Sequence, residues 1–219
     1  MRKCYFTSKS IHEKSQQMLQ ELKTFRERHK IDFKPGHCAL LILDMQRYFL
    51  DESSHAHIPS ALAIIPEVKS LMNAFLNNKL PVILTRHLNT PKDANLMDKW
   101  WRDLITEEST LSEITPELKH PDAVIIKKTQ YDAFYKTPLE DILRKNEVTQ
   151  IVITGVMTHL CCETTSRSAF VRGFEVFFTI DGTATYNEDF HRATLLNMSH
   201  GFAIPVLCEE IKEQLRALE

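Results

Sequence analysis

The sequence predicts an α/β domain built on a parallel β-sheet that helices cover on both faces. Short apolar runs without alternation recur along the chain, which is typical of strands buried on both sides. Segments with apolar residues at helical spacing lie between these runs, and this order indicates βαβ units. With 219 residues, 43% of them hydrophobic, the chain suits one domain with a substantial core.

The strands are predicted where β-branched and aliphatic residues cluster. Asp44 ends the first run, and Gly155 follows the fourth run, where it permits a tight turn. In a parallel sheet of this kind, ligands bind beyond the carboxyl ends of the strands, so the residues that follow the strands are candidates for function. The predicted strands are 39–43, 81–87, 123–128, 150–154, 175–180 and 203–207.

Helices are predicted where apolar residues recur three or four positions apart. In the helix that begins at Cys161, we expect Phe170 and Val171 on the buried side, with Thr158 as a candidate cap. The long polar connection 89–117 follows the second strand, and such connections are usually functional or partly helical. The predicted helices are 8–30, 62–78, 137–146, one from Cys161 onward, 188–200 and 209–218.

The chain is predicted to consist of an N-terminal helical extension, residues 1–35, and a single domain, residues 36–219. In the extension, Ile11, Met18 and Leu22 recur at helical spacing with charged residues between them. This narrow apolar stripe is compatible with packing on the domain itself or on a second subunit.

Composition and charge exclude several classes of protein. The net charge of −2 gives no electrostatic signature of binding to nucleic acid or to an anionic membrane. No apolar run approaches the roughly 18 residues of a membrane helix, and the amino-terminal residues lack the apolar core of a secretory signal. Five scattered cysteines without a C-x-x-C pair predict a reduced, cytoplasmic protein. Glycine-rich nucleotide-binding motifs are absent, and we predict no cofactor.

Three chemically capable side chains follow predicted strands: Asp44 the first, Lys128 the third and Cys161 the fourth. Each has a structural explanation when taken alone. Asp44 could cap a turn, Lys128 could be a solvated strand end, and Cys161 could be a small buried hydrophobe. Together they place an acid, a cation and a nucleophile at one edge of a sheet. At the start of a helix, unpaired N–H groups and the helix dipole would lower the pKa of the Cys161 thiol.

Three segments carry a resemblance to a known family. They are LDMQRYF at 43–49, KTQYDAF at 128–134 followed by TPL, and GVMTHLCCETT at 155–165. With these segments the chain resembles the isochorismatase-like, or cysteine hydrolase, superfamily over roughly residues 36–207. The resemblance implies a three-layer fold with a six-stranded parallel sheet of order 3-2-1-4-5-6. It also implies a homo-oligomer, either a dimer or a tetramer.

The resemblance further implies a catalytic apparatus. Asp44, Lys128 and Cys161 fall on the family's Asp–Lys–Cys triad. A cis peptide bond is implied between Val156 and Met157, which would point the N–H groups of Met157 and Cys161 at one oxyanion. The implied chemistry is acyl transfer, in which Asp44 takes the thiol proton and Lys128 stabilises the thiolate. Cys161 then attacks an amide or related carbonyl through a thioester intermediate.

Residues around the predicted nucleophile are expected to bind a small-molecule substrate. Cys162 is a weaker candidate nucleophile, because neighbouring helical positions point about 100° apart and both thiols cannot face one pocket. Trp100 is expected to line the pocket, and Trp101 to pack in a lid or an interface. His87 could bind a substrate carboxylate. The predicted substrate-binding residues are Gln46, Phe49, His87, Trp100, Tyr131, Phe134 and His159.

Two alternatives to hydrolysis of an amide or carbamoyl C–N bond remain open. True isochorismatases, which hydrolyse a vinyl ether, resemble the chain around Tyr131 and His159, yet many of them have glycine at the cysteine position. A catalytically silent member could instead serve as a binding or assembly module through its N-terminal helix.

Nicotinamidase-like members of the superfamily hold a metal through an Asp and histidines after the first strand. Asp51, His55 and His57 lie in that region, but the family's Asp-x-His arrangement is absent. Imidazoles two residues apart could share a metal only in an extended or looped segment. We therefore predict a solvated polar loop there and no metal.

Overall fold

Six parallel strands form the sheet in a computed structural model that describes residues 2–217. They are β1 (Cys38–Leu43), β2 (Val82–His87), β3 (Val124–Lys128), β4 (Gln150–Val156), β5 (Glu175–Ala184) and β6 (Ile204–Val206). Their order is β3-β2-β1-β4-β5-β6, so the predicted fold class and strand order are confirmed. All residues of β1 and β4 are buried, as expected of central strands covered on both faces.

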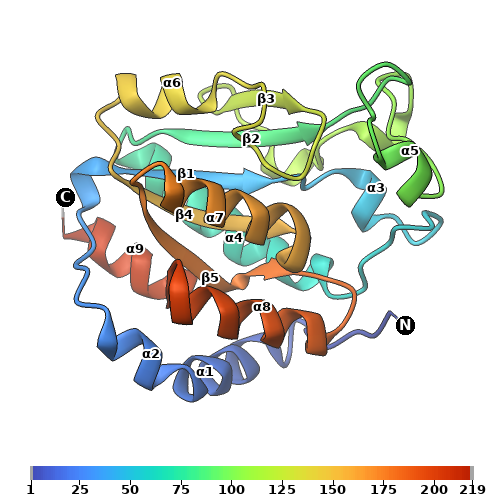
Figure 1. The fold of residues 1–219 in the computed structure, drawn as a ribbon. Helices are drawn as coiled ribbons and strands as arrows, with labels where there is room; N and C mark the ends of the chain where they lie inside the picture. The colour runs from blue at the N-terminus through green and yellow to red at the C-terminus, as the bar shows by residue number, and fades with distance from the viewer. Residues whose placement is uncertain (1, 218–219) are drawn as a thin grey trace.

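Helices cover both faces of the sheet, and Figure 1 shows α7 (Glu163–Val171) in front of it and α4 (Ala61–Asn77) behind it. α4 packs on α9 (Cys208–Arg216), and α7 packs on α8 (Glu188–Gly201). In residues 2–217, no helix is long and apolar enough to cross a membrane. The other α-helices are α1 (Ile11–Glu21), α2 (Lys23–Arg28), α3 (Arg47–Leu50), α5 (Met97–Trp100) and α6 (Leu139–Lys145).

Two predicted helices differ from the observed ones. The predicted helix 8–30 is divided into α1 and α2, which meet at Leu22. The helix predicted from Cys161 onward begins earlier, with a π-helical turn at Thr158–Cys162 that we call the π turn. The predicted end of the last helix, Leu218, lies outside the described residues.

The buried side of α7 differs from the prediction. Phe170 and Val171 are 49% and 78% exposed, so the expectation that they lie on the buried side is wrong. The residues that α7 turns inward are Thr165, Ser166 and Ala169. Their small side chains let the helix lie close to β5, and the two larger side chains are left on the outer face.

The N-terminal residues pack on the domain itself. Phe6, Ile11 and Met18 belong to the same hydrophobic core as the sheet, and α1 contacts β5. Ser60, at the start of α4, accepts hydrogen bonds from the backbone N–H groups of Tyr5 (2.9 Å) and Phe6 (3.0 Å). Of the two packing modes that the apolar stripe allows, the structure contains the one on the chain's own domain.

Gly155 lets β1 and β4 approach closely at the edge of the sheet where the predicted site lies. It pairs with Leu43 in the parallel ladder and has a φ of +108°, a conformation that residues with side chains rarely adopt. A Cβ at this position would lie 2.1 Å from the carbonyl oxygen of Leu43. The absence of a side chain at Gly155 therefore sets how near Asp44 lies to the turn that follows β4.

We expect Gly155→Ala to lower the free energy of unfolding by at least about 2 kcal/mol, because the added methyl group meets backbone atoms at a positive φ. Gly36→Ala is the matched control, since a Cβ there meets nothing within 4 Å. The control should change the free energy of unfolding by less than about 0.5 kcal/mol. Urea unfolding measures both values, and equal midpoints for the two variants would contradict the close contact.

Candidate active site

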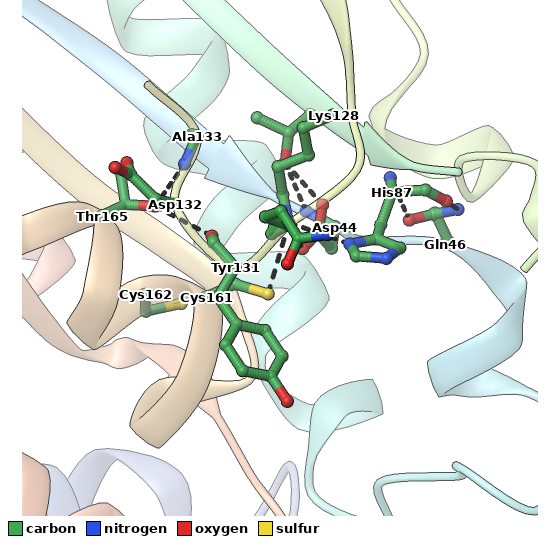
Figure 2. A network of polar contacts seen from close by, with 12 residues as sticks. Asp44, Gln46, His87, Lys128, Tyr131, Asp132, Ala133, Cys161, Cys162 and Thr165 are labelled. Carbon is green, nitrogen blue, oxygen red and sulfur yellow. Dashed lines mark hydrogen bonds and ion pairs between the residues drawn. The ribbon is translucent and has the colours of Figure 1, made fainter. Parts of the chain in front are cut away.

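The carboxyl ends of β1, β3 and β4 bring Asp44, Lys128 and Cys161 together, as Figure 2 shows. Lys128 Nζ lies 2.8 Å from Asp44 Oδ2 and 3.4 Å from Cys161 Sγ. The side chains of Asp44 and Lys128 have no solvent exposure. β3 is separated from β1 by β2, and the long lysine side chain spans this gap. The three groups therefore form one buried cluster.

Asp44 is held by the end of β1 and by Thr85 of β2. Its backbone has a φ of +50°, a left-handed conformation that aspartate tolerates better than most residues. The Asp44 N–H donates to Thr85 Oγ1 (3.0 Å), and the Thr85 hydroxyl donates to Asp44 Oδ1 (2.6 Å). Among the described residues, no donor makes a hydrogen bond of suitable angle to Asp44 Oδ2. This second oxygen therefore meets the ammonium of Lys128 only as an ion pair.

Lys128 donates hydrogen bonds to three acceptors. They are Cys161 Sγ at 3.4 Å, the carbonyl oxygen of Gln130 at 2.9 Å and Nδ1 of His87 at 3.2 Å. His87 is the partner of Lys128 in the β2–β3 ladder, so the strand register brings the imidazole to the amine. The ammonium is thus bonded on every side within the protein, which offsets its loss of water.

The buried ion pair is favoured in its charged form. Burial raises the pKa of Asp44, but Lys128, His87 and Cys161 together outweigh burial and hold the pKa below its usual value. Burial lowers the pKa of Lys128, but Asp44 and Cys161 together outweigh burial and hold the pKa above its usual value. The lowered carboxyl pKa contributes stability above about pH 4 that is lost as pH falls, and the raised amine pKa contributes stability below about pH 10 that is lost as pH rises. The pair therefore stabilises the fold between these limits.

The Cys161 thiol is protonated at neutral pH. Burial, with a further contribution from the Asp44 carboxylate, raises its pKa to about 12, although Lys128 opposes the shift. The prediction that this pKa is lowered is therefore wrong. That prediction rested on a cysteine at the first position of a helix, but Cys161 is the fourth residue of the π turn and is buried beside a carboxylate. The resting cluster thus holds a carboxylate, an ammonium and a neutral thiol.

The two adjacent thiols have different surroundings. Cys161 lines a pocket, whereas Cys162 has no solvent exposure and places its Sγ 3.9 Å from the carbonyl oxygen of Thr154. This difference follows from the angle of about 100° between neighbouring positions in a helix. Cys161 is therefore the thiol that a small molecule in the pocket can reach.

The π turn is supported by the N-terminal part of the chain. The peptide bond between Val156 and Met157, just before the turn, is cis, as the resemblance implies. Thr158 Oγ1 hydrogen-bonds with His191 Nδ1 at 3.0 Å. The ring of Tyr5 lies against the imidazole of His191, with 5.2 Å between their centroids. Contacts thus extend from the amino-terminal segment to the turn that carries Cys161.

A pocket with aromatic walls reaches Cys161. The space between its walls is about 530 Å³, open solvent at its mouth included. Trp101 Nε1 donates a hydrogen bond to the Tyr131 hydroxyl (2.8 Å) and so ties two walls together. The aromatic lining consists of Tyr48, Phe49, Trp101, Tyr131 and Tyr186, and the polar lining includes His55, His87, Asn89 and Asp103.

Some of the predicted substrate-binding residues line this pocket, namely Phe49, His87 and Tyr131. Trp100 does not, which corrects the prediction for it. Its side chain is 77% exposed, and the neighbouring Trp101 lines the pocket in its place. α5 is a single turn that ends at Trp100, so the two indoles leave the chain in different directions.

Gln46, Phe134 and His159 also lie outside the pocket lining, and each has a structural partner instead. Gln46 has no solvent exposure, and its amide binds the backbone of His87 on both sides. Phe134 is buried and stacks on a neighbouring phenylalanine of the core. His159 Nδ1 hydrogen-bonds with Thr185 Oγ1 at 2.6 Å. That these three residues bind substrate stays a prediction.

Other lining residues were missed by the sequence prediction as substrate contacts. Tyr48 lies inside the first of the three family-like segments, so a signal for it exists. Tyr186 follows β5, and the predicted end of this strand at residue 180 hides its place at the edge of the sheet. Asp103 lies in the connection 89–117, which has no periodic pattern. Among the residues missed are Tyr48, His55, Asp103 and Tyr186.

In the described residues, Asp51, His55 and His57 are not grouped as the ligands of one metal ion. Asp51 accepts a hydrogen bond from the backbone N–H of Ser53 (2.9 Å), and His55 pairs with Asp103 at 3.0 Å. Within residues 2–217, no group of three or more His, Cys, Asp or Glu side chains is arranged to hold a metal ion. That this loop holds no metal stays a prediction.

The family model of the isochorismatase domain matches residues 38–210. The chain belongs to the isochorismatase family. The protein is accordingly a hydrolase of that family, and its matched region includes all six strands and the whole Asp44, Lys128 and Cys161 cluster.

This isochorismatase-family protein is similar to Nicotinamidase 3 from Arabidopsis thaliana, with 39% identity over 195 residues, which is 86% of this chain and 94% of that protein. It is 30% identical over 191 residues to Enterobactin synthase component B from Escherichia coli (strain K12), which is 84% of this chain and 66% of that protein. Its structure is similar to a cysteine hydrolase from Pseudomonas syringae pv. phaseolicola 1448A, with a TM-score of 0.80 and 22% identity over 87% of this chain and 97% of that chain. The last likeness shows a common fold.

We expect Lys128→Met to lower the free energy of unfolding by about 3–5 kcal/mol, because the Asp44 carboxylate is left buried without its partner. Adding Asp44→Asn removes that charge and should restore much of the loss. Lys127→Met is the matched control, because this neighbour is exposed and pairs with Glu107 at the surface, and its effect should be below about 1 kcal/mol. Urea unfolding at pH 7 gives these values. If Lys128→Met is as stable as Lys127→Met, the ion pair does not have the role described.

Proposed function

We propose that the protein hydrolyses the carboxamide of a small aromatic molecule through a thioester on Cys161. The observation that carries this proposal is the cluster beside the pocket, in which Lys128 Nζ lies 2.8 Å from Asp44 and 3.4 Å from Cys161 Sγ. A thiol, a base and a cation at contact distance are the groups that nucleophilic acyl transfer requires. Similarity to a protein named Nicotinamidase 3 supports an aromatic carboxamide as the substrate.

In this proposal the first step moves the thiol proton to Asp44, which interacts with the thiol. Asp44 changes from a carboxylate to an acid, Cys161 changes from a thiol to a thiolate, and Lys128 remains charged. The ammonium loses one anionic partner and gains another. Because the net charge of the buried cluster does not change, the thiolate can form there despite the raised pKa of the thiol.

The thiolate then attacks the carbonyl carbon, so that a C–S bond forms and the carbonyl π electrons move to the oxygen. By resemblance to the family, the backbone N–H groups of Met157 and Cys161 bind this oxyanion, and one such donor contributes about 2.7–4 kcal/mol. Asp44 returns the proton to the amide nitrogen, the C–N bond breaks and ammonia leaves. Cys161 now carries the acyl group as a thioester.

Water completes the cycle. Asp44, again a carboxylate, takes a proton from a water molecule as its oxygen attacks the thioester carbon. The C–S bond breaks, the carboxylic acid leaves, and Asp44 returns the proton to the sulfur of Cys161. The balance is one amide and one water converted to one acid and one ammonia, and each residue of the cluster regains its resting state.

The pocket walls favour a planar ring as the body of the substrate. Aromatic side chains pack on rings through offset faces and edges, and several of them surround the space next to the thiol. Three of these side chains, Phe49, Trp101 and Tyr131, come from separate segments of the chain. In this proposal the ring of the substrate binds between them. Nicotinamide, a small aromatic carboxamide, serves as the probe below.

Vinyl ether hydrolysis of an isochorismate-type substrate is the second candidate. The match to a family model named Isochorismatase domain favours it. The thiol of Cys161 argues against it, because cleavage of a vinyl ether needs a proton donor and no thiolate. A catalytically silent module is a weaker alternative, because α1 is already covered by its own domain and a buried charged cluster would serve no purpose in assembly.

We expect Cys161→Ala to lower kcat for nicotinamide by at least about 10³-fold, because no other group can form the thioester. Cys162→Ala is the matched control and should keep kcat within a few fold, since its sulfur lies in the core. Ammonia release measures both. Full turnover of nicotinamide by Cys161→Ala would refute the proposal. Turnover of isochorismate by both variants, with no amide hydrolysed by the wild type, would establish the second candidate.

We expect Trp101→Ala to raise KM for nicotinamide about 10-fold, because it removes an aromatic wall of the pocket. Trp100→Ala is the matched control, since its indole is 77% exposed, and it should leave KM within about twofold. Steady-state kinetics of ammonia release compares the two. The opposite result, with KM raised only in Trp100→Ala, would show that the pocket lies elsewhere.

A further inference from the structure

The bonding of Lys128 leaves one of its N–H groups for the sulfur. A lysine ammonium has three N–H donors. Nδ1 of His87 accepts one at 3.2 Å, the carbonyl oxygen of Gln130 accepts one at 2.9 Å, and Cys161 Sγ accepts the third at 3.4 Å. The carboxylate of Asp44 is a fourth contact of the amine, an ion pair with 2.8 Å between Asp44 Oδ2 and Lys128 Nζ. The hydrogen bonds to His87 and to the Gln130 carbonyl oxygen thus fix the direction of the third N–H of Lys128.

We propose that His87 is a positioning residue, a neutral imidazole acceptor that aims the Lys128 ammonium at the sulfur of Cys161. With one N–H bound to His87 and one to Gln130, the tetrahedral ammonium cannot rotate, and its remaining N–H is directed at the site of the developing thiolate. The catalytic meaning of this role rests on the proposed function. The effect of His87 on the reactivity of the Cys161 thiol is independent of which substrate the protein hydrolyses.

Asn89 fixes His87 as an acceptor on the side of the lysine. His87 Nε2 lies 2.8 Å from Asn89 Oδ1. The Asn89 amide is oriented by its Nδ2, which donates to the carbonyl oxygen of Thr129 (2.9 Å), so the atom facing the imidazole is the oxygen. An amide oxygen only accepts, and Nε2 must therefore carry the proton. In a neutral imidazole this leaves the lone pair on Nδ1, which faces Lys128.

Gln46 fixes the backbone of His87. Its Oε1 accepts from the His87 N–H (2.8 Å), and its Nε2 donates to the His87 carbonyl oxygen (3.0 Å) and to the Ser112 carbonyl oxygen (2.8 Å). The side-chain amide of Gln46 is thus saturated and buried. A residue held at both backbone groups and at its ring has little freedom to move the amine that it contacts.

The surroundings of His87 keep it neutral. Burial and the charge of Lys128 lower its pKa to about 4, and the carboxylates of Asp44 and Asp93 oppose this only in part. A lowered histidine pKa means that the neutral form persists down to about pH 4, so the acceptor is present throughout the neutral range. Both ring nitrogens are occupied within the protein, and His87 has none left to bind a substrate carboxylate.

The test compares His87→Leu, which has no acceptor, with His87→Gln, whose side-chain oxygen can accept from the amine. His120→Leu, at a partly exposed histidine outside the pocket, is the control for losing an imidazole. The first readout is the rate of alkylation of Cys161 by iodoacetamide at pH 8, followed by peptide mass spectrometry so that Cys4 and the other thiols are counted apart. The second readout is kcat and KM for nicotinamide.

We expect His87→Leu to lower the alkylation rate of Cys161 and kcat by about 10-fold or more, with KM within about twofold of the wild type. His87→Gln should recover both rates to within about threefold of the wild type. Asn89→Asp, which favours a protonated imidazole that can only donate, should resemble His87→Leu. The double variant of His87→Leu and Asn89→Asp should be no slower than His87→Leu alone, because both changes act on the same contact.

Two results would overturn the inference. One is a wild-type alkylation rate in a folded His87→Leu variant, and the other is a raised KM with unchanged kcat, which would make His87 a substrate-binding residue. If His87→Leu does not fold, the comparison of His87→Gln with Asn89→Asp decides in its place, and equal alkylation rates in these two would refute the role. Absence of nicotinamide hydrolysis with the alkylation contrast intact would reject the proposed function and keep the inference.

Discussion

A buried ion pair between Asp44 and Lys128 is the interaction on which the rest of the site depends. Neither side chain touches solvent, so each charge is tolerable only because of the other and of the hydrogen bonds around them. Those bonds come from the strand between them, β2, which supplies Thr85 to the carboxylate and His87 to the amine. The strand order therefore brings the two charges to one edge of the sheet. It also places the side chains that bind them, Thr85 and His87, on β2 between β1 and β3.

The same pair explains how a thiol with a raised pKa can belong to a reactive site. A helix dipole that simply ionised Cys161 would leave a permanent anion next to Asp44 in a desolvated space. The structure instead keeps sulfur neutral at rest, with a base and a cation already in contact with it. In the proposed reaction a proton moves from the sulfur of Cys161 to the carboxylate of Asp44. The ammonium of Lys128 stabilises the carboxylate before this transfer and the thiolate after it. Pre-organisation of Lys128 then matters more than the intrinsic acidity of the thiol.

The sequence predicts the sheet and the meeting of Asp44, Lys128 and Cys161 well, because apolar runs mark buried strands and parallel strands end at one edge. It predicts the surroundings less well. The choice between Trp100 and Trp101 depends on where a one-turn helix ends inside a connection without periodicity. The pKa of the thiol depends on burial and on a neighbouring carboxylate, which are tertiary effects that a local dipole argument omits.

The amino-terminal segment has a consequence for handling this protein. Tyr5 accepts a hydrogen bond from the backbone N–H of Thr185 through its hydroxyl, and its ring rests on His191, which in turn binds Thr158 at the start of the π turn. Protease clipping within the first few residues, or an affinity tag fused tightly against them, would loosen this support without touching the pocket. A preparation shortened to residues 36–219 would lack the contacts of Tyr5 that support the turn carrying Cys161.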